Sequence, residues 1–440
     1  MFSANYLSAF KSRLIHLYKQ PLIIGSLWIL AGQVVSVVMQ LAYFILLARS
    51  LGAEDLGKFT AVASLTTIAY PFATLGADFL LSRDVSRDPS RARVKISWGN
   101  ALLLTSISSS ILILILFFVA WVILPKSISL LTLLFVFLAE IFFMAVWGCI
   151  HSILIALNCH RKSAQLGAIY NFTKLLAVLI FAAMFRHQGV QAWTFLYAIS
   201  TFCMVLVGCL TIFTMVGFPD LRLRPDHLKE YVREGIYFSI GGTTACLSAN
   251  IDKTLLASFS TLEATGLYSA AFRFIGMANL PLGVLSSSLH AKFFSEGKFG
   301  IAKVFQFGKQ FILPACIYGV VVFIGFLFLG PFIPFLLGDE YRDSIPALYW
   351  LAPLPFLSGL SWIATDILDG SGHQRSRSFV NISSVFFTLP LCYLLIPKYS
   401  WKGAAWATVL SSLMVTICYW GVVCFLKQKE IKLRKYSQIN

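Results

Sequence analysis

Charged side chains are scarce in this sequence. Only 12% of its 440 residues are charged, and just 19 are Asp or Glu. A soluble domain carries about 25% charged and about 45–50% apolar residues, whereas 58% of this chain is hydrophobic and its mean hydropathy is +0.79. These values exclude a soluble globular protein, a disordered chain and a collagen-like fibre. The class that remains is a protein that uses lipid as its solvent.

The sequence also lacks the motifs of several enzyme and pump classes. It has no C-x-x-C pair, no H-E-x-x-H, no G-x-S-x-G and no G-x-x-x-x-G-K-[ST] loop for nucleotide phosphates. The nine cysteines fall almost entirely in apolar runs, which predicts small buried hydrophobes and no disulfide framework. The histidines show no metal-ligand spacing, including His16, His187, His227 and His290. We therefore expect no metal site, no cofactor and no enzyme activity.

Long apolar runs, in contrast, are abundant, and each is long enough to cross a bilayer as a helix. They are too long, and alternate too little, to be strands of a membrane barrel. The sequence predicts an all-α polytopic membrane protein with about twelve spans. These lie near residues 22–47, 59–81, 97–124, 128–156, 164–185, 190–216, 235–259, 267–290, 304–329, 345–370, 379–396 and 403–426.

The excess of basic residues, which gives a net charge of +16, indicates the orientation of these spans. With the N-terminus inside, the cytoplasmic segments hold 24 Lys and Arg residues and the opposite segments hold 7. Basic residues concentrate in cytoplasmic loops, so this bias predicts that both termini are cytoplasmic. The same distribution favours binding of the basic loops to an anionic membrane surface over binding to nucleic acid.

An internal repeat divides the chain. Residues 46–61 read LLARSLGAEDLGKFTA and residues 255–270 read LLASFSTLEATGLYSA, with six identities in sixteen positions at an offset of 209. The offset equals six spans, which predicts two pseudo-symmetric six-helix lobes of the same orientation around a central cavity. We expect an N-terminal lobe over 1–216, a basic cytoplasmic linker over 217–234 and a C-terminal lobe over 235–440.

Polar side chains follow helical spacing on three of the spans and are expected to line that cavity. The alternative is that Ser and Thr stripes only hold helices together. The stripe residues expected to line the cavity are Gln33, Gln40, Ser64, Thr67, Thr243 and Asn250. Through the repeat, Arg273 falls on the position of Ser64, and so on the same face.

Charged residues within spans need a reason because each costs roughly 2.5–3.5 kcal/mol at the bilayer centre. We expect a cationic substrate site formed by Arg273, Lys253 and Lys174. Asp252 and Glu140 are candidates for ion coupling; Glu140 is alternatively a structural partner for Lys174. Asp252 and Lys253 are adjacent and are not expected to face each other. Two further carboxylates near the end of a span, Asp366 and Asp369, are expected at the membrane interface.

Two stretches, LLARSLGAEDLGKFTAVASL and NIDKTLLASFSTLEATGLYSAAFRF, resemble the flippases that move lipid-linked polysaccharide repeat units across the bacterial inner membrane. That family belongs to the multidrug/oligosaccharidyl-lipid/polysaccharide exporter group, and the resemblance extends over essentially the whole chain. It implies an undecaprenyl-pyrophosphate-linked oligosaccharide, such as an O-antigen unit, as cargo. It also implies a cationic central cavity and alternating access. Partners would be the lipid bilayer, and polysaccharide polymerase and chain-length proteins are further candidates.

Three alternatives stay open. A multidrug or cation antiporter has the same general fold, but three cations in the expected cavity favour an anionic cargo. A lipid II flippase would need much the same cavity. A glycan polymerase or ligase is expected to carry a substantial polar loop outside, and here the outside loops are short.

Overall fold

The computed structural model describes residues 21–222 and 225–437, and every regular element in these residues is helical. The helices that form the bulk of the bundle are α2 (Pro21–Thr74), α3 (Ala77–Arg87), α4 (Arg91–Ile123), α5 (Leu130–Phe137), η1 (Leu138–Phe143), α6 (Met144–Ala156), α7 (His160–Ile180), η2 (Phe181–Phe185), η3 (Arg186–Gln188), α8 (Gly189–Met215), α9 (Pro225–Phe259), α10 (Leu262–Gly297), α11 (Ile301–Lys309), α12 (Ile312–Leu329), α14 (Ser344–Leu351), α15 (Leu354–Gly370) and α16 (Gln374–Ser437). Short turns η4 (Gly330–Phe332), α13 (Ile333–Leu337) and η5 (Asp339–Tyr341) join α12 to α14.

These elements make twelve passes, as predicted, because two of the long helices each contain two. α2 is interrupted at Gly52, whose φ of 76° breaks the helical path between the first and second passes. α16 is interrupted in the same way at Ser400, with φ 53°. Positive φ is cheap for glycine and costly for serine. The two prolines of α16 at positions 390 and 397 precede this second break.

Hydropathy alone finds fewer spans than the fold contains. Within the described residues, seven helical stretches are long and apolar enough to cross a membrane, and two of these are 56 and 59 residues long. Neither α9 nor α10 is among the seven. Both helices carry the polar and charged residues expected to line the cavity, and these lower their mean hydropathy. The least apolar passes are therefore the ones on which the site is expected.

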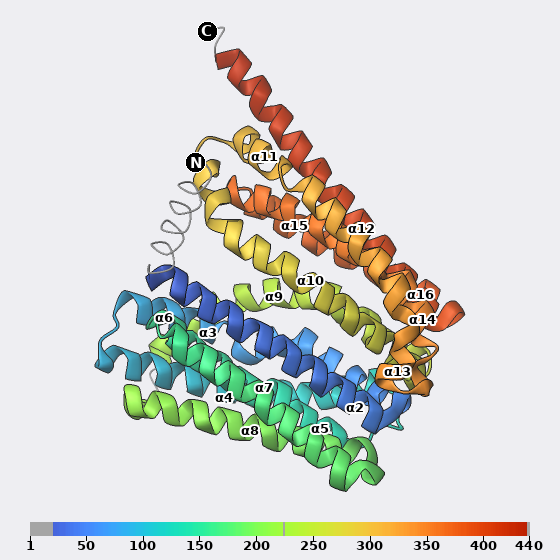
Figure 1. The fold of residues 1–440 in the computed structure, drawn as a ribbon. Helices are drawn as coiled ribbons and strands as arrows, with labels where there is room; N and C mark the ends of the chain where they lie inside the picture. Colours follow the sequence, from blue (N-terminus) through green and yellow to red (C-terminus); the bar gives the residue numbers. More distant parts are fainter. Residues whose placement is uncertain (1–20, 223–224, 438–440) are drawn as a thin grey trace, which may run out of the picture.

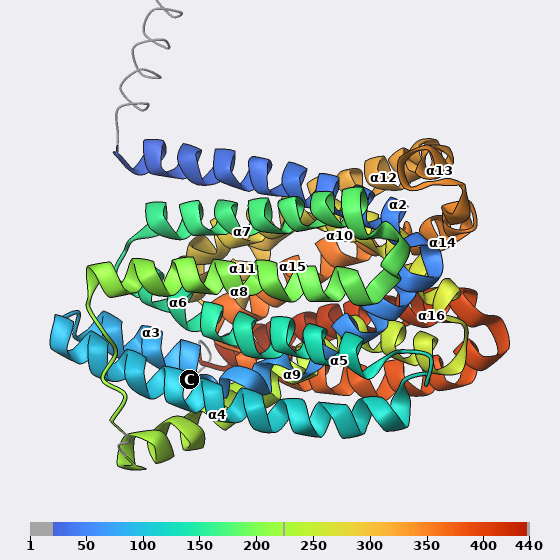
Figure 2. The same cartoon turned by 90° about the horizontal axis from the view of Figure 1, so that it is seen from below.

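The helices form two lobes. Helices α2 to α8 pack together in one, and α10 to α16 pack together in the other (Figure 1). The lobes meet at one end of the bundle, called here the converging end, which holds the turns 124–129, 186–189 and 330–343. They separate toward the other, diverging end, where α2 begins and α16 ends (Figure 1). Seen from below, the helices of both lobes run along one common direction (Figure 2).

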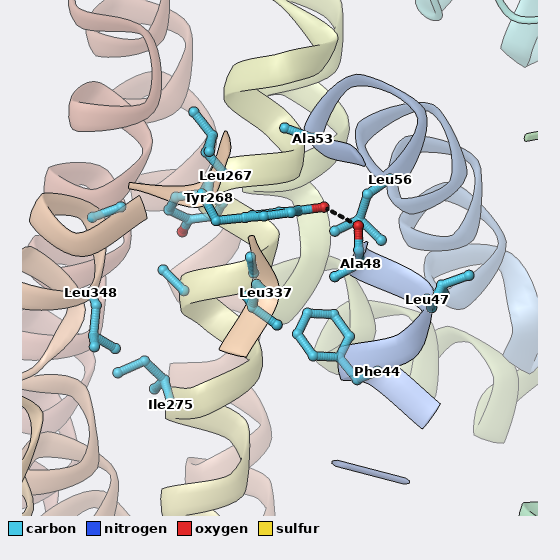
Figure 3. Close-up of a cluster of buried hydrophobic side chains, with 14 of the residues drawn as sticks. Phe44, Leu47, Ala48, Ala53, Leu56, Leu267, Tyr268, Ile275, Leu337 and Leu348 are labelled. Carbon is cyan, nitrogen blue, oxygen red and sulfur yellow. Dashed lines mark hydrogen bonds between the residues drawn. The ribbon is translucent and has the colours of Figure 1, made fainter. Parts of the chain in front are cut away.

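The converging end is held by a core that draws on both lobes. Phe44, Leu47 and Ala48 of α2 pack in one cluster with buried residues of α10 and of the α13–α14 region (Figure 3). The Tyr341 hydroxyl donates a hydrogen bond of 3.1 Å to the Ala48 carbonyl within this cluster. Between helices in lipid, close side-chain packing and hydrogen bonds of this kind hold the helices together. These contacts join the two lobes at this end.

Helix α9 belongs to both lobes. Near its start, the Tyr231 hydroxyl donates to the Asp84 carboxylate of α3 (2.7 Å), and Ser239 donates to the Pro71 carbonyl of α2 (2.8 Å). Near its end, Asp252 accepts from Thr408 of α16 (3.1 Å). The expected division of the chain at residues 217–234 stays a prediction, because this helix crosses from one lobe to the other.

All nine cysteines are free, as expected. Their burial differs from the prediction: Cys149 and Cys392 are buried, whereas Cys203 and Cys424 are exposed on the outer surface of the bundle. An apolar run on a membrane helix presents one face to lipid, so an apolar neighbourhood in the sequence does not imply burial in the protein.

Candidate functional site between the lobes

Lys174 is held by tyrosines inside the first lobe. Its ammonium on α7 donates to the Tyr197 hydroxyl of α8 at 3.0 Å. It also lies over the Tyr170 and Tyr197 rings, 4.2 and 4.7 Å from their centroids. The Tyr197 hydroxyl in turn donates to the Glu140 carboxylate. Lys174 and Glu140 are thus linked through one hydroxyl, which agrees with the alternative of Glu140 as a structural partner.

The backbone around Glu140 is unusual. Residues 138–143 form a π-helix between α5 and α6, with Glu140 in its first turn. A π turn inserts one extra residue and turns the side chains around it relative to an α-helix, and such turns are frequent at functional sites. Around the cluster, Trp193 lies 5.8 Å from Tyr43 and 5.6 Å from Tyr197, ring centroid to centroid. The carboxylate is therefore fixed in an aromatic setting.

Arg273 connects the two lobes. Its guanidinium on α10 donates to the Gln40 side chain of α2 at 3.5 Å and lies 5.8 Å from the centroid of the Phe44 ring. The Nε atom is buried and has no hydrogen-bond partner. The sequence predicted Arg273 on the face that corresponds to that of Ser64. In the structure it contacts α2, and its part in a substrate site stays a prediction.

Lys253 lies in a second cluster within the other lobe. Its ammonium donates to the Ala249 carbonyl (3.2 Å) and the Asn250 side chain (3.4 Å), and lies 3.8 Å from the centroid of the Phe272 ring. It is 3.6 Å from the Asp252 carboxylate. The expectation that these adjacent residues do not face each other is wrong, because the long Lys253 side chain turns back along the helix.

The Asp252 carboxylate accepts three hydrogen bonds. It accepts from the Tyr268 hydroxyl (2.5 Å), from Thr408 (3.1 Å) and from the Lys253 backbone N–H (2.8 Å). Only 3% of the residue is exposed. Buried charges are found paired and hydrogen-bonded because an isolated one is very costly. Its proposed part in ion coupling stays a prediction.

The polar stripes have mixed roles. Ser64 is buried and bonds Thr254 across the lobes at 2.9 Å, so at this position the helix-holding alternative applies. Thr67 is exposed and donates to the Ala63 carbonyl. The Thr243 hydroxyl is buried without a partner, and Asn250 donates to the Cys246 carbonyl. The side chain of Gln33 lies outside the described residues.

The site residues therefore fall into two groups with Arg273 between them. Lys174 and Glu140 belong to the first lobe, and Lys253, Asp252 and Asn250 belong to the second. Sequence reasoning missed the tyrosines at positions 170, 197 and 268 that hold these charges. In an apolar span, tyrosine does not stand out from the other aromatic residues, so no spacing signal marked them.

Comparison with known proteins agrees with this architecture. Residues 22–291 match the family described as polysaccharide biosynthesis protein. An uncharacterized membrane protein of Methanocaldococcus jannaschii is 20% identical over 91% of this chain and 83% of its own length. The fold is similar to the inward-facing conformation of a multidrug resistance MATE family transporter of the MOP superfamily (TM-score 0.71, 15% identity, 89% of this chain and 96% of that one). It is also similar to the lipid II flippase MurJ in an inward closed conformation (TM-score 0.70, 14% identity, 91% and 87%).

The protein is thus a polytopic membrane protein with the two-lobe, twelve-helix fold of MOP superfamily transporters. More particularly, the chain belongs to the polysaccharide biosynthesis protein family.

Proposed function

We propose that this chain is a flippase for oligosaccharide repeat units linked to undecaprenyl pyrophosphate, such as O-antigen units. It moves them from the cytoplasmic to the periplasmic leaflet of the bacterial inner membrane. Membership of the polysaccharide biosynthesis family supports the substrate class, and the fold shared with a lipid II flippase supports the mode of transport. The basic loops favour cytoplasmic termini, which would turn the diverging end toward the cytoplasm.

The observation that carries the proposal is the lack of an ion-pair partner for Arg273 within the described residues. Within the described residues no carboxylate lies within ion-pair distance of it, and its Nε is buried without a partner. The guanidinium is partly buried, and its planar fork suits the oxygens of a phosphate. A pyrophosphate headgroup that enters between the lobes would supply the missing anion.

In this mechanism the pyrophosphate pairs with Arg273 and Lys253, while Gln33, Gln40 and Asn250 contact sugar hydroxyls. Lys253 exchanges its bonds to Ala249 and Asn250 for the phosphate oxygens. The polyprenyl tail stays in the lipid. Rocking of one lobe against the other then opens the converging end and closes the diverging end, as in other transporters with paired repeats.

The presence of the Glu140 carboxylate within a span favours a multidrug or cation antiporter, because carboxylates attract cationic substrates. Its charge is countered by Lys174 through Tyr197, which leaves the region between the lobes with an excess of positive charge. Asp252 and Glu140 stay our candidates for binding a coupling ion, and a polysaccharide polymerase and chain-length proteins stay candidate partners.

The test uses purified protein in liposomes that contain a fluorescent, short-chain polyprenyl-pyrophosphate oligosaccharide. We expect Arg273→Ala and Lys253→Ala to reduce the flipping rate at least tenfold, which is about 1.4 kcal/mol, and Arg273→Lys to retain part of it. The matched control is Arg342→Ala, since this arginine is 75% exposed on a turn. Wild-type flipping by both cavity variants refutes the assignment. Export of a cationic dye without lipid flipping supports the antiporter instead.

A further inference from the structure

A polar cavity of about 420 Å³ lies in the second lobe, on its diverging side and away from Arg273. It is lined by residues of α10, α15 and the start of α16, namely Ser286, His290, Trp362, Thr365, Asp366, Asp369 and Arg377 with their neighbours. Asp366 and Asp369 are 7% and 4% exposed, so both are buried within the protein, and their expected place near the membrane interface stays a prediction. They face the inside of the lobe because α15 turns this side toward α10.

Within this cavity His290 and Asp366 form a pair. The Nδ1 atom of His290 lies 3.3 Å from one oxygen of the Asp366 carboxylate, and Ser286 donates to the other oxygen at 2.8 Å. The carboxylate is buried, whereas the imidazole is 46% exposed at the mouth of the cavity. A proton can therefore reach His290 from water, while the group that stabilises it is protected from water.

The protonation state of His290 decides the net charge of the cavity. The Asp369 carboxylate from α15 is paired with Arg377 of α16, so these two charges offset each other. The other groups that line the cavity from α10, α15 and α16 do not ionise, and no charged residue of α11 or α12 lines it. With neutral His290 the cavity carries one net negative charge, and with protonated His290 it carries none.

We propose that His290 and Asp366 form a proton-binding site that couples the second lobe to the pH gradient. In the deprotonated state the Nδ1–H is donated to Asp366 and Nε2 faces the cavity. A proton taken from water binds Nε2, giving an imidazolium next to the carboxylate. Histidine is the side chain whose charge ordinarily changes between about pH 5 and 8. Coupling to transport rests on the proposed function; proton binding does not.

The place of the pair in the fold gives protonation a mechanical consequence. α10 contains Pro281, which lies between the contact with the first lobe and His290. Beyond it, the helix packs directly on α15, where a Cβ on Gly297 would lie 1.7 Å from the Gly370 carbonyl. The Ser286 and His290 bonds to Asp366 join the same two helices. Loss of the net charge would change this junction, and with it the angle between the two halves of α10.

The first measurement needs no substrate. In nanodiscs that hold the full-length protein with ¹⁵N-labelled histidine, the His290 signal is the one missing in His290→Gln. We expect this signal to shift with pH as the imidazole takes up a proton. In Asp366→Asn the midpoint should move to lower pH, because the anion that stabilises the imidazolium is gone. An unchanged midpoint in Asp366→Asn overturns the proposal.

The second measurement tests coupling. Spin labels at S86C and K298C, exposed positions on the diverging side of the two lobes, report the separation of the lobes as pH is varied. If the two conformations differ by one pH unit in proton affinity, their ratio should change by about tenfold across the titration. We expect His290→Gln to abolish the change and the control His187→Gln to retain it. Equal pH responses in wild type and His290→Gln overturn the coupling. Neither measurement needs a lipid-linked substrate, so failure of the proposed function would leave both results interpretable.

Discussion

Gly57 and Gly266 pack backbone to backbone where α2 crosses α10 at the converging end. A Cβ on Gly57 would lie 1.7 Å from the Leu262 carbonyl oxygen, and one on Gly266 would lie 1.9 Å from that of Ala53. The two glycines are 209 residues apart, as are Ala53 and Leu262. The repeated positions therefore meet each other across the pseudo-twofold axis, and the glycine shared by the two halves is explained by this contact.

The first prediction concerns this crossing. Gly57→Ala would force α2 and α10 apart, and overpacking of this kind costs about 1–3 kcal/mol. We expect a lower thermal unfolding midpoint for purified protein. The matched control is Gly325→Ala on α12, where a Cβ meets nothing within 4 Å. There, alanine should be neutral or slightly stabilising, because it is the better helix former. Equal midpoints for the two variants would show that the crossing tolerates a methyl group.

The sequence predicts those features of the fold and site that depend on the order of residues along the chain, and it does not predict those that depend on how helices pack. The passes and the repeat depend on long apolar runs and on a Glu and Gly that recur at a fixed offset, and both can be read directly. The repeat predicted which face of α10 carries Arg273, and that face contacts α2 through Gln40. The tyrosine partners of Lys174 could not be found, because their positions depend on how α7 and α8 pack. The burial of Asp366 was missed for the same reason.

A second prediction concerns a latch between the lobes at the converging end. The Glu340 carboxylate in the turn after α13 accepts the Ala53 backbone N–H at 3.3 Å, just beyond the break at Gly52. It thus caps the second half of α2, where the orphan N–H groups of a helix start attract an anion. Arg49 of the same region donates to the Leu336 carbonyl at 2.7 Å. These bonds must break before the converging end can open.

We expect Glu340→Ala to raise the population of molecules that are open at the converging end, by about fivefold for a loss of about 1 kcal/mol. Glu340→Gln keeps an acceptor oxygen and should lie between the alanine variant and the wild type. Spin labels at S127C and D343C, both exposed positions at this end, measure the opening. Asp339→Ala is the control, since Asp339 is 91% exposed one residue away. A distance distribution for Glu340→Ala that matches the wild type would argue that the apolar core alone keeps this end closed.

A third prediction separates the charge of Asp252 from its hydrogen bonds. Thr408→Val removes one donor and should cost about 0.5–1.5 kcal/mol of unfolding free energy. Asp252→Ala also leaves the nearby Lys253 buried without its anion, and should cost about 3–5 kcal/mol. Denaturant unfolding of both variants in the same detergent measures the difference. Similar losses would mean that Lys253 does not depend on Asp252, and that its bonds to Ala249 and Asn250 are sufficient.

The last prediction tests whether Lys174 and Glu140 act as a unit through Tyr197. Replacing either charge alone leaves the other in an aromatic, low-dielectric setting, so Lys174→Met and Glu140→Gln should each destabilise the protein strongly. The double variant removes both charges and should be more stable than the sum of the single losses implies, by about 0.5–3 kcal/mol. Tyr197→Phe removes the hydroxyl between them and should weaken the coupling while the ring contacts with Lys174 stay. The same unfolding assay completes the cycle. Strict additivity would mean that the two charges are stabilised independently, and Glu140 would then be available to bind a cation.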